Sequence, residues 1–125
     1  MIIVKLGGSA GIDPAYTLDD IAALGKTEEI VFIHGANAKL DEMTRALGRE
    51  PRIVHSRSGQ VSRFTDSETM DLMLAVYAGT VNKRLVEGLQ QRGVNAVGLS
   101  AMDGRIASGP RKDTIRAIED GKPKV

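Results

Sequence analysis

A lysine and a pair of glycines stand at the end of the first apolar run, in VKLGGSAG (residues 4–11). Two adjacent glycines let the backbone approach a ligand closely and turn N–H groups toward anionic oxygens. Lys5 falls on the same side of the run as Ile3, so its charge must escape at the strand end or meet an anion. These residues suit phosphate binding. The commoner use of Gly-Gly is a tight turn, and no complete nucleotide-binding fingerprint is present, so both interpretations stay open.

A second glycine follows the next apolar run, in HGANAK (34–39). Gly35 ends that run, and a helix is predicted to begin at Ala36 or Asn37. The first N–H groups of a helix have no partner within it and can hold a carboxylate or a phosphate. The alternative is an ordinary turn capped by Asn37. His34, at the strand end, is more often a structural residue than a catalytic one in such a place.

Arg63, in QVSRFTD (60–66), is the third candidate for anion binding. It lies just ahead of a predicted helix start, from which it could point back over the strand ends. A guanidinium group grips a carboxylate or a phosphate through two parallel N–H bonds. The alternative is a solvent-exposed arginine. No Ser/His/Asp arrangement and no metal-ligand spacing accompanies these residues, so we expect no metal held by the protein itself.

The elements that position these residues alternate along the chain. Short apolar runs predict strands, and apolar residues three and four apart predict helices between them. The predicted strands are 2–6, 29–35 and 95–99, the predicted helices are 17–25, 37–48 and 65–93, a β-hairpin is predicted over 51–63, and short strands are predicted near 105–107 and 114–117. Gly79 is expected to break or bend the long helix.

This order predicts an α/β fold with a largely parallel sheet covered on both faces. Such sheets bind ligands beyond the carboxyl ends of their strands. Gly7-Gly8, Gly35 and the loop 100–104 each follow a predicted strand. We therefore expect these three loops to meet at one edge of the sheet.

The composition favours one soluble domain with an aliphatic core, since 42% of the 125 residues are hydrophobic and 3% are aromatic. The net charge of +1 argues against a dedicated nucleic-acid binder. No apolar run reaches the roughly 18 residues of a membrane span, and the first residues lack the basic leader of a secretory signal. The absence of cysteine excludes disulfides, thiolate metal sites and thiol nucleophiles. We expect a cytoplasmic protein.

Positive charge gathers in residues 45–63, where five arginines face Glu50 alone. This segment is either an ordinary solvated surface or a docking site for an acidic partner. The arginines ahead of Arg63 are the docking candidates: Arg45, Arg49, Arg52 and Arg57.

Five motifs in order resemble the amino-acid kinase family. They are VKLGGS, IHGANAK, GQVSRFTD, GTVNKRLVEGLQ and NAVGLSAMDGR, which together span residues 1–104, with a looser similarity to the end of the chain. Within the family they look most like acetylglutamate kinases. The branch they resemble most phosphorylates 2-aminoadipate or glutamate carried on the small acidic protein LysW.

The resemblance implies a three-layer αβα sandwich in which residues 1–125 form the N-terminal, acyl-acceptor part. It implies ATP-dependent phosphorylation of a side-chain carboxylate to an acyl phosphate, in lysine or arginine biosynthesis, with Mg²⁺ on the ATP. The nucleotide-binding half of the family's longer chain would then be absent. We therefore expect these 125 residues alone to be inactive.

The resemblance also implies roles for single residues. Lys5 matches the catalytic lysine that stabilises charge on the transferring phosphoryl group. The family's phosphate-binding loop corresponds to Gly7, Gly8 and Ser9. Together with Lys5, this loop is expected to cradle the phosphates of ATP. This arrangement is physically sensible, because fixed positive charge and N–H dipoles must offset the repulsion between two approaching anions.

On the acceptor side, the amides of Gly35 and Ala36 match those that hold the substrate's α-carboxylate or its equivalent. Arg63 matches a substrate-binding arginine. Ala36 stands where the family usually has glycine, and its Cβ restricts φ at that amide. Asn82 and Lys83 match a recurrent motif with no assigned role.

Two alternatives remain at the level of function. A plain N-acetylglutamate kinase would share the site but not the carrier, so the arginine cluster would have no acidic partner. A non-catalytic binding module would keep the fold without phosphoryl transfer. The resemblance also implies a homodimer or a larger homo-oligomer for the full-length protein.

Overall fold

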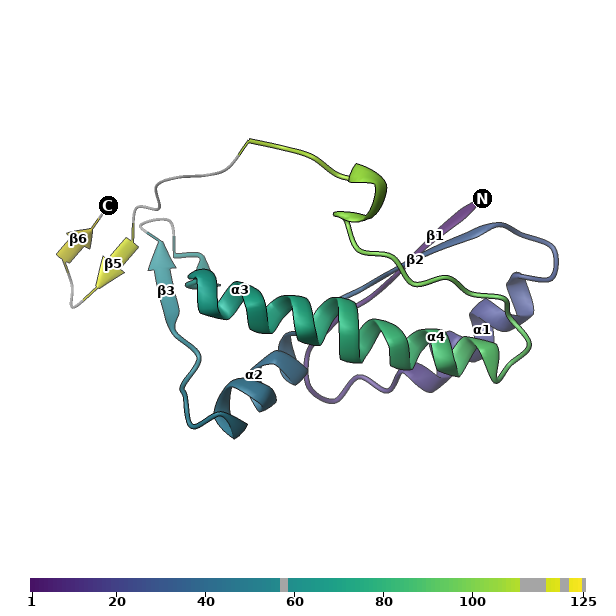
Figure 1. Cartoon of the computed structure of the whole chain (residues 1–125), viewed down its shortest axis with the longest axis horizontal. Helices are drawn as coiled ribbons and strands as arrows, with labels where there is room; N and C mark the ends of the chain where they lie inside the picture. The colour runs from purple at the N-terminus through teal and green to yellow at the C-terminus, as the bar shows by residue number, and fades with distance from the viewer. Residues whose placement is uncertain (57–58, 111–116, 120–121, 125) are drawn as a thin grey trace.

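The computed structural model describes residues 1–56, 59–110, 117–119 and 122–124. Two of the predicted strands, β1 (Ile2–Leu6) and β2 (Ile30–His34), pair in parallel. Their register runs from Ile2 opposite Ile30 to Leu6 opposite His34. The carboxyl ends of the two strands are therefore level, and the loops that follow them start side by side (Figure 1).

Helix α1 (Pro14–Leu24) begins three residues before the predicted start. Asp13 caps it by accepting a hydrogen bond from the Ala15 amide at 2.9 Å, and proline occupies the first turn, where its missing N–H costs nothing. Helix α2 (Asn37–Ala46) has Ala36 at its N-cap and no side-chain cap. The prediction of Asn37 as the capping residue is therefore wrong.

One long helical stretch lies across the molecule (Figure 1). It consists of α3 (Ser67–Met73), a π-helical segment (Leu74–Val81) and α4 (Asn82–Gln90). The predicted irregularity at Gly79 is confirmed as this π segment, which changes the helical phase without breaking the helix.

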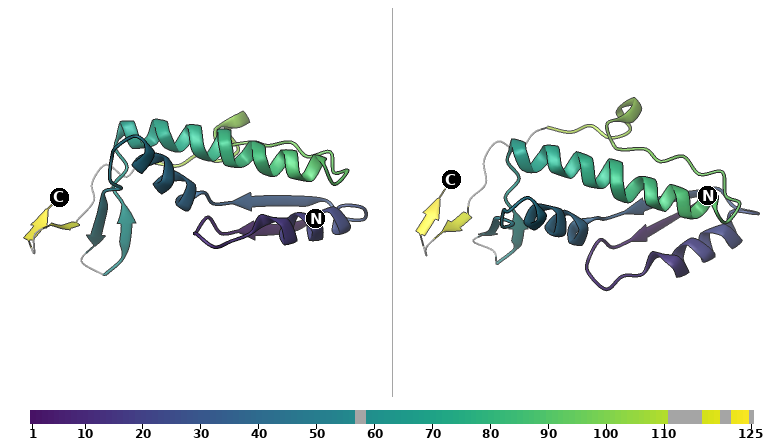
Figure 2. Two further views of the ribbon diagram at one scale, coloured as in Figure 1. Left: turned by 90° about the horizontal axis from the view of Figure 1, so that it is seen from below. Right: turned by 60° about the horizontal axis from the view of Figure 1, so that its bottom comes forward.

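The predicted hairpin is confirmed by β3 (Ile53–Ser56) and β4 (Val61–Arg63), which pair antiparallel with Ile53 opposite Arg63. Strand β5 (Ala117–Glu119) pairs with β3, and β6 (Lys122–Lys124) pairs with β5. The sheet has the order β4-β3-β5-β6 and is separate from the parallel pair. Figure 2 shows the hairpin near the end of the long helix where α3 begins.

The predicted strand over 95–99 is wrong, because the structure pairs these residues with neither β1 nor β2. Side chains of α4, and not a neighbouring strand, satisfy the carbonyl groups of Gly98 and Leu99. The strand predicted near 105–107 is also wrong, since a short 3₁₀ turn covers Asp103–Arg105. Of the strand predicted at 114–117, residues 114–116 lie outside the described part.

The main core lies between the parallel strands and two helices. Leu18 and Ile21 of α1 pack with Leu85 and Leu89 of α4, and inward side chains of β1 and β2 contact this cluster. A second core joins α2 to the π segment and centres on Leu40 and Val76. Apolar spacing predicts the inward face of α4 correctly, whereas Leu47, which the same spacing assigns to the inward face of α2, is 58% exposed.

The other face of β1 and β2 is open among the described residues. Ile3, Val31 and Ile33 are 65%, 45% and 49% exposed, and Lys5 lies on the same side. The α/β class with parallel strands and helices is confirmed. Helices cover one face of the parallel pair rather than both in the described ranges.

Candidate functional site

The loops after β1 and β2 contact each other through their backbones. A methyl group added to Gly8 would overlap the Gly35 carbonyl carbon and the Ala36 nitrogen, and it would lie 2.8 Å from the Asn37 nitrogen. The Ala38 amide donates a hydrogen bond to the Gly8 carbonyl at 2.7 Å. The sequence predicts that the glycine loops share one edge, and for these two loops the prediction is confirmed.

Ala36 adopts its backbone conformation without the conformational freedom of a glycine. Its φ is −149°, a negative value that alanine can adopt. Its side chain is buried in the core formed by α2 and the π segment, where it packs with Leu40 and Val76. The Cβ of Ala36 therefore anchors the start of α2 in this core.

Lys5 is exposed on the open face of β1, opposite Ile33 in the register. The alternation of the strand places it away from the core, so its charge stays in water. Within the part of the chain that the structure describes, no acidic side chain pairs with it. Gly7 and Ser9 are also exposed, while Gly8 is partly buried against the second loop.

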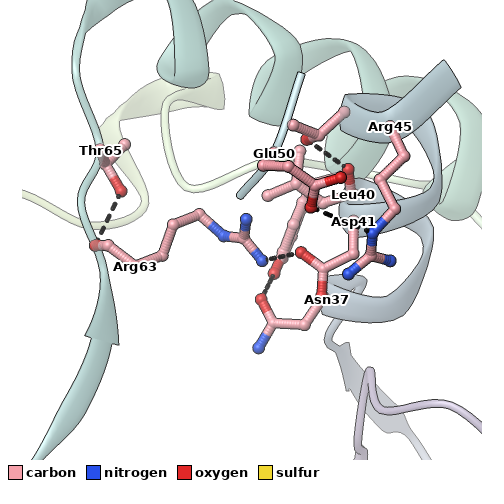
Figure 3. A network of polar contacts seen from close by, with 9 residues as sticks. Asn37, Leu40, Asp41, Arg45, Glu50, Arg63 and Thr65 are labelled. Carbon is pink, nitrogen blue, oxygen red and sulfur yellow. Dashed lines mark hydrogen bonds and ion pairs between the residues drawn. The ribbon is translucent and has the colours of Figure 1, made fainter. Parts of the chain in front are cut away.

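Arg63 points from the end of β4 to α2, where its Nη2 atom donates to Asp41 Oδ1 (Figure 3). Its side chain is 14% exposed and that of Asp41 is 31% exposed. The interpretation of Arg63 as an ordinary solvent-exposed arginine is therefore wrong. A single contact to one carboxylate oxygen leaves several of the five guanidinium donors available.

A hydrogen bond between Tyr77 and Asn37 lies beside this ion pair. The Tyr77 hydroxyl donates to Asn37 Oδ1 at 2.6 Å, which ties the π segment to the first turn of α2. Figure 3 shows Asn37 beside Asp41 on the same side of that helix. Sequence reasoning missed Asp41, and the available signal was its spacing of four residues from Asn37, which places both on one helix face.

The third predicted loop, 100–104, closes on itself. Asp103 Oδ2 accepts hydrogen bonds from the Ser100 amide at 2.5 Å and from the Ser100 hydroxyl at 2.9 Å. These bonds favour the carboxylate and hold the pKa of Asp103 below its ordinary value. Asn82 of α4 bridges the segment just before the loop to the end of β2, because its amide nitrogen lies near both the Leu99 carbonyl and His34.

The candidate docking arginines are less isolated than the sequence indicates. Arg45 pairs with Glu50 at 3.6 Å, and Arg49 pairs with Glu68 of α3 at 2.9 Å. Arg52 lies 4.1 Å from the centroid of the Phe64 ring. Arg57 lies outside the described residues. Glu68 follows the cluster in the sequence, so counting charges over 45–63 misses its contribution.

The described residues contain neither a cluster suited to hold a metal ion nor a helix suited to span a membrane. No group of three histidine, aspartate or glutamate side chains there comes together in a way that could hold a metal ion. No described helix is both long enough and apolar enough to span a bilayer.

Comparison with known proteins gives a family match over nearly the whole chain. The profile of the amino acid kinase family matches residues 1–122. A [LysW]-aminoadipate kinase of Deinococcus radiodurans is 48% identical over 126 aligned positions, which cover 100% of this chain and 43% of the relative. A protein of the same name from Thermus thermophilus is 45% identical over 126 positions and is covered to 47%.

Acetylglutamate kinases are similar as well. That of Dehalococcoides mccartyi is 37% identical over 122 positions, covering 97% of this chain and 42% of the relative. The chain thus spans less than half the length of these curated relatives. Since the family profile covers nearly every residue, the chain belongs to the amino acid kinase family.

Proposed function

We propose that the protein carrying this chain transfers the γ-phosphoryl group of ATP to the side-chain carboxylate of 2-aminoadipate or glutamate held on a small acidic carrier protein. The product is an acyl phosphate, an intermediate suited to lysine or arginine biosynthesis. Residues 1–125 supply the acyl-acceptor part. The observation that carries the proposal is the backbone contact between Gly8 and Gly35, which joins two candidate anion-binding loops at one edge.

In the proposed step, a carboxylate oxygen of the acceptor attacks the γ-phosphorus. The bond to the β–γ bridging oxygen breaks, and ADP leaves with that electron pair. Both reactants are anions, so catalysis requires positive charge and N–H dipoles where they meet. Lys5 has the right properties, because its amine is exposed and unpaired among the described residues. In this proposal it stabilises the charge on the transferring phosphoryl group.

The phosphate side of the site consists of the loop after β1. Gly7 and Ser9 are exposed, and Gly8 packs against the second loop. Together with Lys5, this loop is proposed to cradle the phosphates of ATP through its N–H groups. Mg²⁺ is proposed to enter with the nucleotide, whose charge it reduces.

The acceptor side consists of the loop after β2 and the end of the hairpin. The Gly35 and Ala36 amides are proposed to hold the substrate's α-carboxylate or its equivalent. Arg63 is proposed to bind the acceptor through the donors that Asp41 leaves available. Asp41 then orients the guanidinium before the substrate arrives.

The carrier is proposed to dock on the arginine cluster of Arg45, Arg49, Arg52 and Arg57. Surface ion pairs of the Arg49–Glu68 kind contribute little to stability, so an acidic partner can replace the glutamate at small cost. A biosynthetic kinase that uses ATP is expected to work in the cytoplasm, as a homodimer or a larger homo-oligomer.

Substrate competition in the complete protein tests the proposal. The protein receives Mg²⁺-ATP and either carrier-bound aminoadipate, carrier-bound glutamate or free N-acetylglutamate, and hydroxylamine traps any acyl phosphate as a hydroxamate. We expect trapping with a carrier-bound substrate. Trapping with free N-acetylglutamate alone would replace the proposal with an acetylglutamate kinase, an alternative that the relative from Dehalococcoides mccartyi supports. No trapping with any acceptor would favour the non-catalytic module.

The docking surface has its own test, in which Arg49→Glu is compared with Arg84→Glu. Both arginines are exposed and the charge change is equal, but Arg84 lies on α4 and pairs with Glu87. We expect Arg49→Glu to weaken carrier binding and to make the remaining binding less sensitive to salt, because fewer attractive charges remain to be screened. Equal carrier affinity in the two variants would contradict the docking site.

A further inference from the structure

A buried polar contact joins the start of α4 to the end of β2. Asn82 is 7% exposed, and its amide nitrogen lies 3.3 Å from His34 Nε2 and 3.5 Å from the Leu99 carbonyl oxygen. The next residue, Lys83, donates from Nζ to the Gly98 carbonyl at 3.0 Å. Two consecutive residues of α4 therefore hold two consecutive carbonyl groups.

The orientation of the Asn82 amide determines which nitrogen of His34 carries the proton. A backbone carbonyl oxygen only accepts hydrogen bonds, so the Asn82 atom facing Leu99 must be the NH₂ group. The same NH₂ group faces His34 Nε2, and this nitrogen must then accept. A neutral imidazole has one donor and one acceptor, so this orientation of the Asn82 amide puts the His34 proton on Nδ1. His34 Nδ1 and Asn82 Oδ1 are both buried without a hydrogen-bond partner among the described residues.

The segments joined by Asn82 both lead into the proposed site. His34 immediately precedes Gly35 and Ala36, whose amides are proposed to hold the acceptor. Leu99 immediately precedes the turn closed by Ser100 and Asp103. Without Asn82, the 95–99 segment would lose the side-chain bridge that links it to β2, and no strand pairing replaces that bridge.

The fit around Asn82 is close on the side of the 95–99 segment. A methyl group added to Gly98 would overlap Asn82 Oδ1 and would lie 2.8 Å from Val86 Cγ2. Gly98 is therefore the residue that lets this segment approach α4 closely enough for both carbonyl bonds to form. The contact can be broken from either side, at Asn82 or at Gly98.

We propose that Asn82 is a positioning residue that sets the Gly35–Ala36 loop through His34 and the 100–104 loop through Leu99. Lys83 holds the same segment at Gly98. The inference rests on the proposed kinase function for its effect on acceptor binding, whereas the contact itself can be tested without turnover. Asn82 acts through these neighbours and need not contact the reacting atoms.

Kinetics of Asn82→Leu in the complete protein test the role in positioning. Leucine keeps the volume of the side chain and removes both donors. We expect the KM for the acceptor to rise roughly tenfold or more, as the loss of a buried hydrogen-bond partner suggests, while kcat and the KM for ATP change less than about threefold. An unchanged acceptor KM in a folded variant would overturn the proposal.

A second variant and a control keep this result interpretable. Gly98→Ala pushes on the Asn82 amide from the opposite side, so it should raise the acceptor KM in the same direction. Thr44→Val removes another buried polar group, whose hydroxyl donates to the Leu40 carbonyl at 2.7 Å within α2. If Thr44→Val raised the acceptor KM equally, the effect would reflect general loss of stability and the proposal would be wrong.

Nitrogen NMR of the complete protein tests the contact independently of activity. In the wild type, His34 should show the Nδ1–H tautomer, and in Asn82→Leu its Nε2 signal and the Gly35 amide signal should shift. A wild-type Nε2–H tautomer would mean that Asn82 Oδ1, not its NH₂ group, faces His34, whereas unchanged His34 and Gly35 signals in Asn82→Leu would overturn the contact. If the wild type phosphorylates no acceptor, the proposed function fails, and the His34 and Gly35 signals still decide whether Asn82 positions the loop.

Discussion

Lys5 and Arg63, the two cations proposed to bind substrate, are held in opposite ways. The strand alternation leaves Lys5 exposed and without an acidic partner among the described residues. Arg63 is largely enclosed and already donates to Asp41. A free ammonium group can follow charge that moves during the reaction, whereas a fixed guanidinium group is suited to hold an anion in one orientation. The structure thus fits a mobile cation for the phosphoryl group and an oriented one for the acceptor.

Replacing Lys5 with alanine tests the first of these roles. We expect kcat of the complete protein to fall roughly a hundredfold or more, because a positive charge beside the transferring phosphoryl group is lost. The melting temperature should change little, since the side chain is exposed and makes no ion pair with described residues. Lys26→Ala removes another exposed lysine, in the turn after α1, and should leave kcat unchanged. Wild-type phosphoryl transfer in Lys5→Ala would remove Lys5 from the mechanism.

The sequence predicts the strands and helices that are marked by a local pattern of apolar residues. Apolar runs rich in β-branched residues identify β1 and β2, and apolar spacing identifies the long helix. The segment 95–99 has the same apolar character but lies unpaired, because strand formation requires a partner that local sequence does not specify. The Arg63–Asp41 pair is equally invisible to local patterns, since it joins residues 22 positions apart.

Because the two glycine loops touch, replacing glycine with alanine should lower stability at Gly8 but not at Gly79. Gly8→Ala adds a methyl group against the Gly35 and Ala36 backbone and should destabilise the protein by about 1–3 kcal/mol, as overpacking does. Gly79→Ala adds a methyl group that meets no atom within 4 Å, inside a helix, where alanine is preferred. Denaturant unfolding of both variants measures the difference. Equal stability would mean that the loops do not touch.

The start of α3 predicts a dependence of stability on pH. Asp66 caps this helix by accepting from the Thr69 amide at 2.8 Å, and that bond lowers the pKa of Asp66 from 3.8. A lowered folded-state pKa stabilises the protein above the unfolded value, and this contribution is lost as the pH falls through the folded value. Asp66→Asn retains a cap that does not titrate.

Melting temperatures measured between pH 7 and pH 2.5 check this expectation. The wild type should be the more stable at pH 7, and its advantage over Asp66→Asn should disappear below about pH 4. Asp20→Asn, on the exposed side of α1, controls for the loss of a surface carboxylate. A constant difference between wild type and Asp66→Asn down to the lowest pH would show that the cap is not ionised.

At the scale of the whole molecule, the parallel strands are covered by α1 and α4 on one face and are open on the other. The open face presents Ile3, Val31 and Ile33 around Lys5. Parallel sheets are stable when both faces are covered, and exposed apolar patches of this kind mark a surface that packs against something. The chain spans less than half of its relatives' length, so further polypeptide is the partner that best fits.

The substitution Val31→Thr should therefore have opposite effects in the isolated 125-residue chain and in the complete protein. In the 125-residue chain alone, Val31→Thr removes apolar surface from water, so binding of a hydrophobic dye and self-association should decrease. In the complete protein, the same change would bury a hydroxyl group against apolar neighbours and should lower the melting temperature. Tyr16→Thr, at an exposed position on α1, should reduce dye binding without destabilising the complete protein. A Val31→Thr complete protein as stable as the wild type would show that this face stays in water, and the active site would then have to be completed from another side.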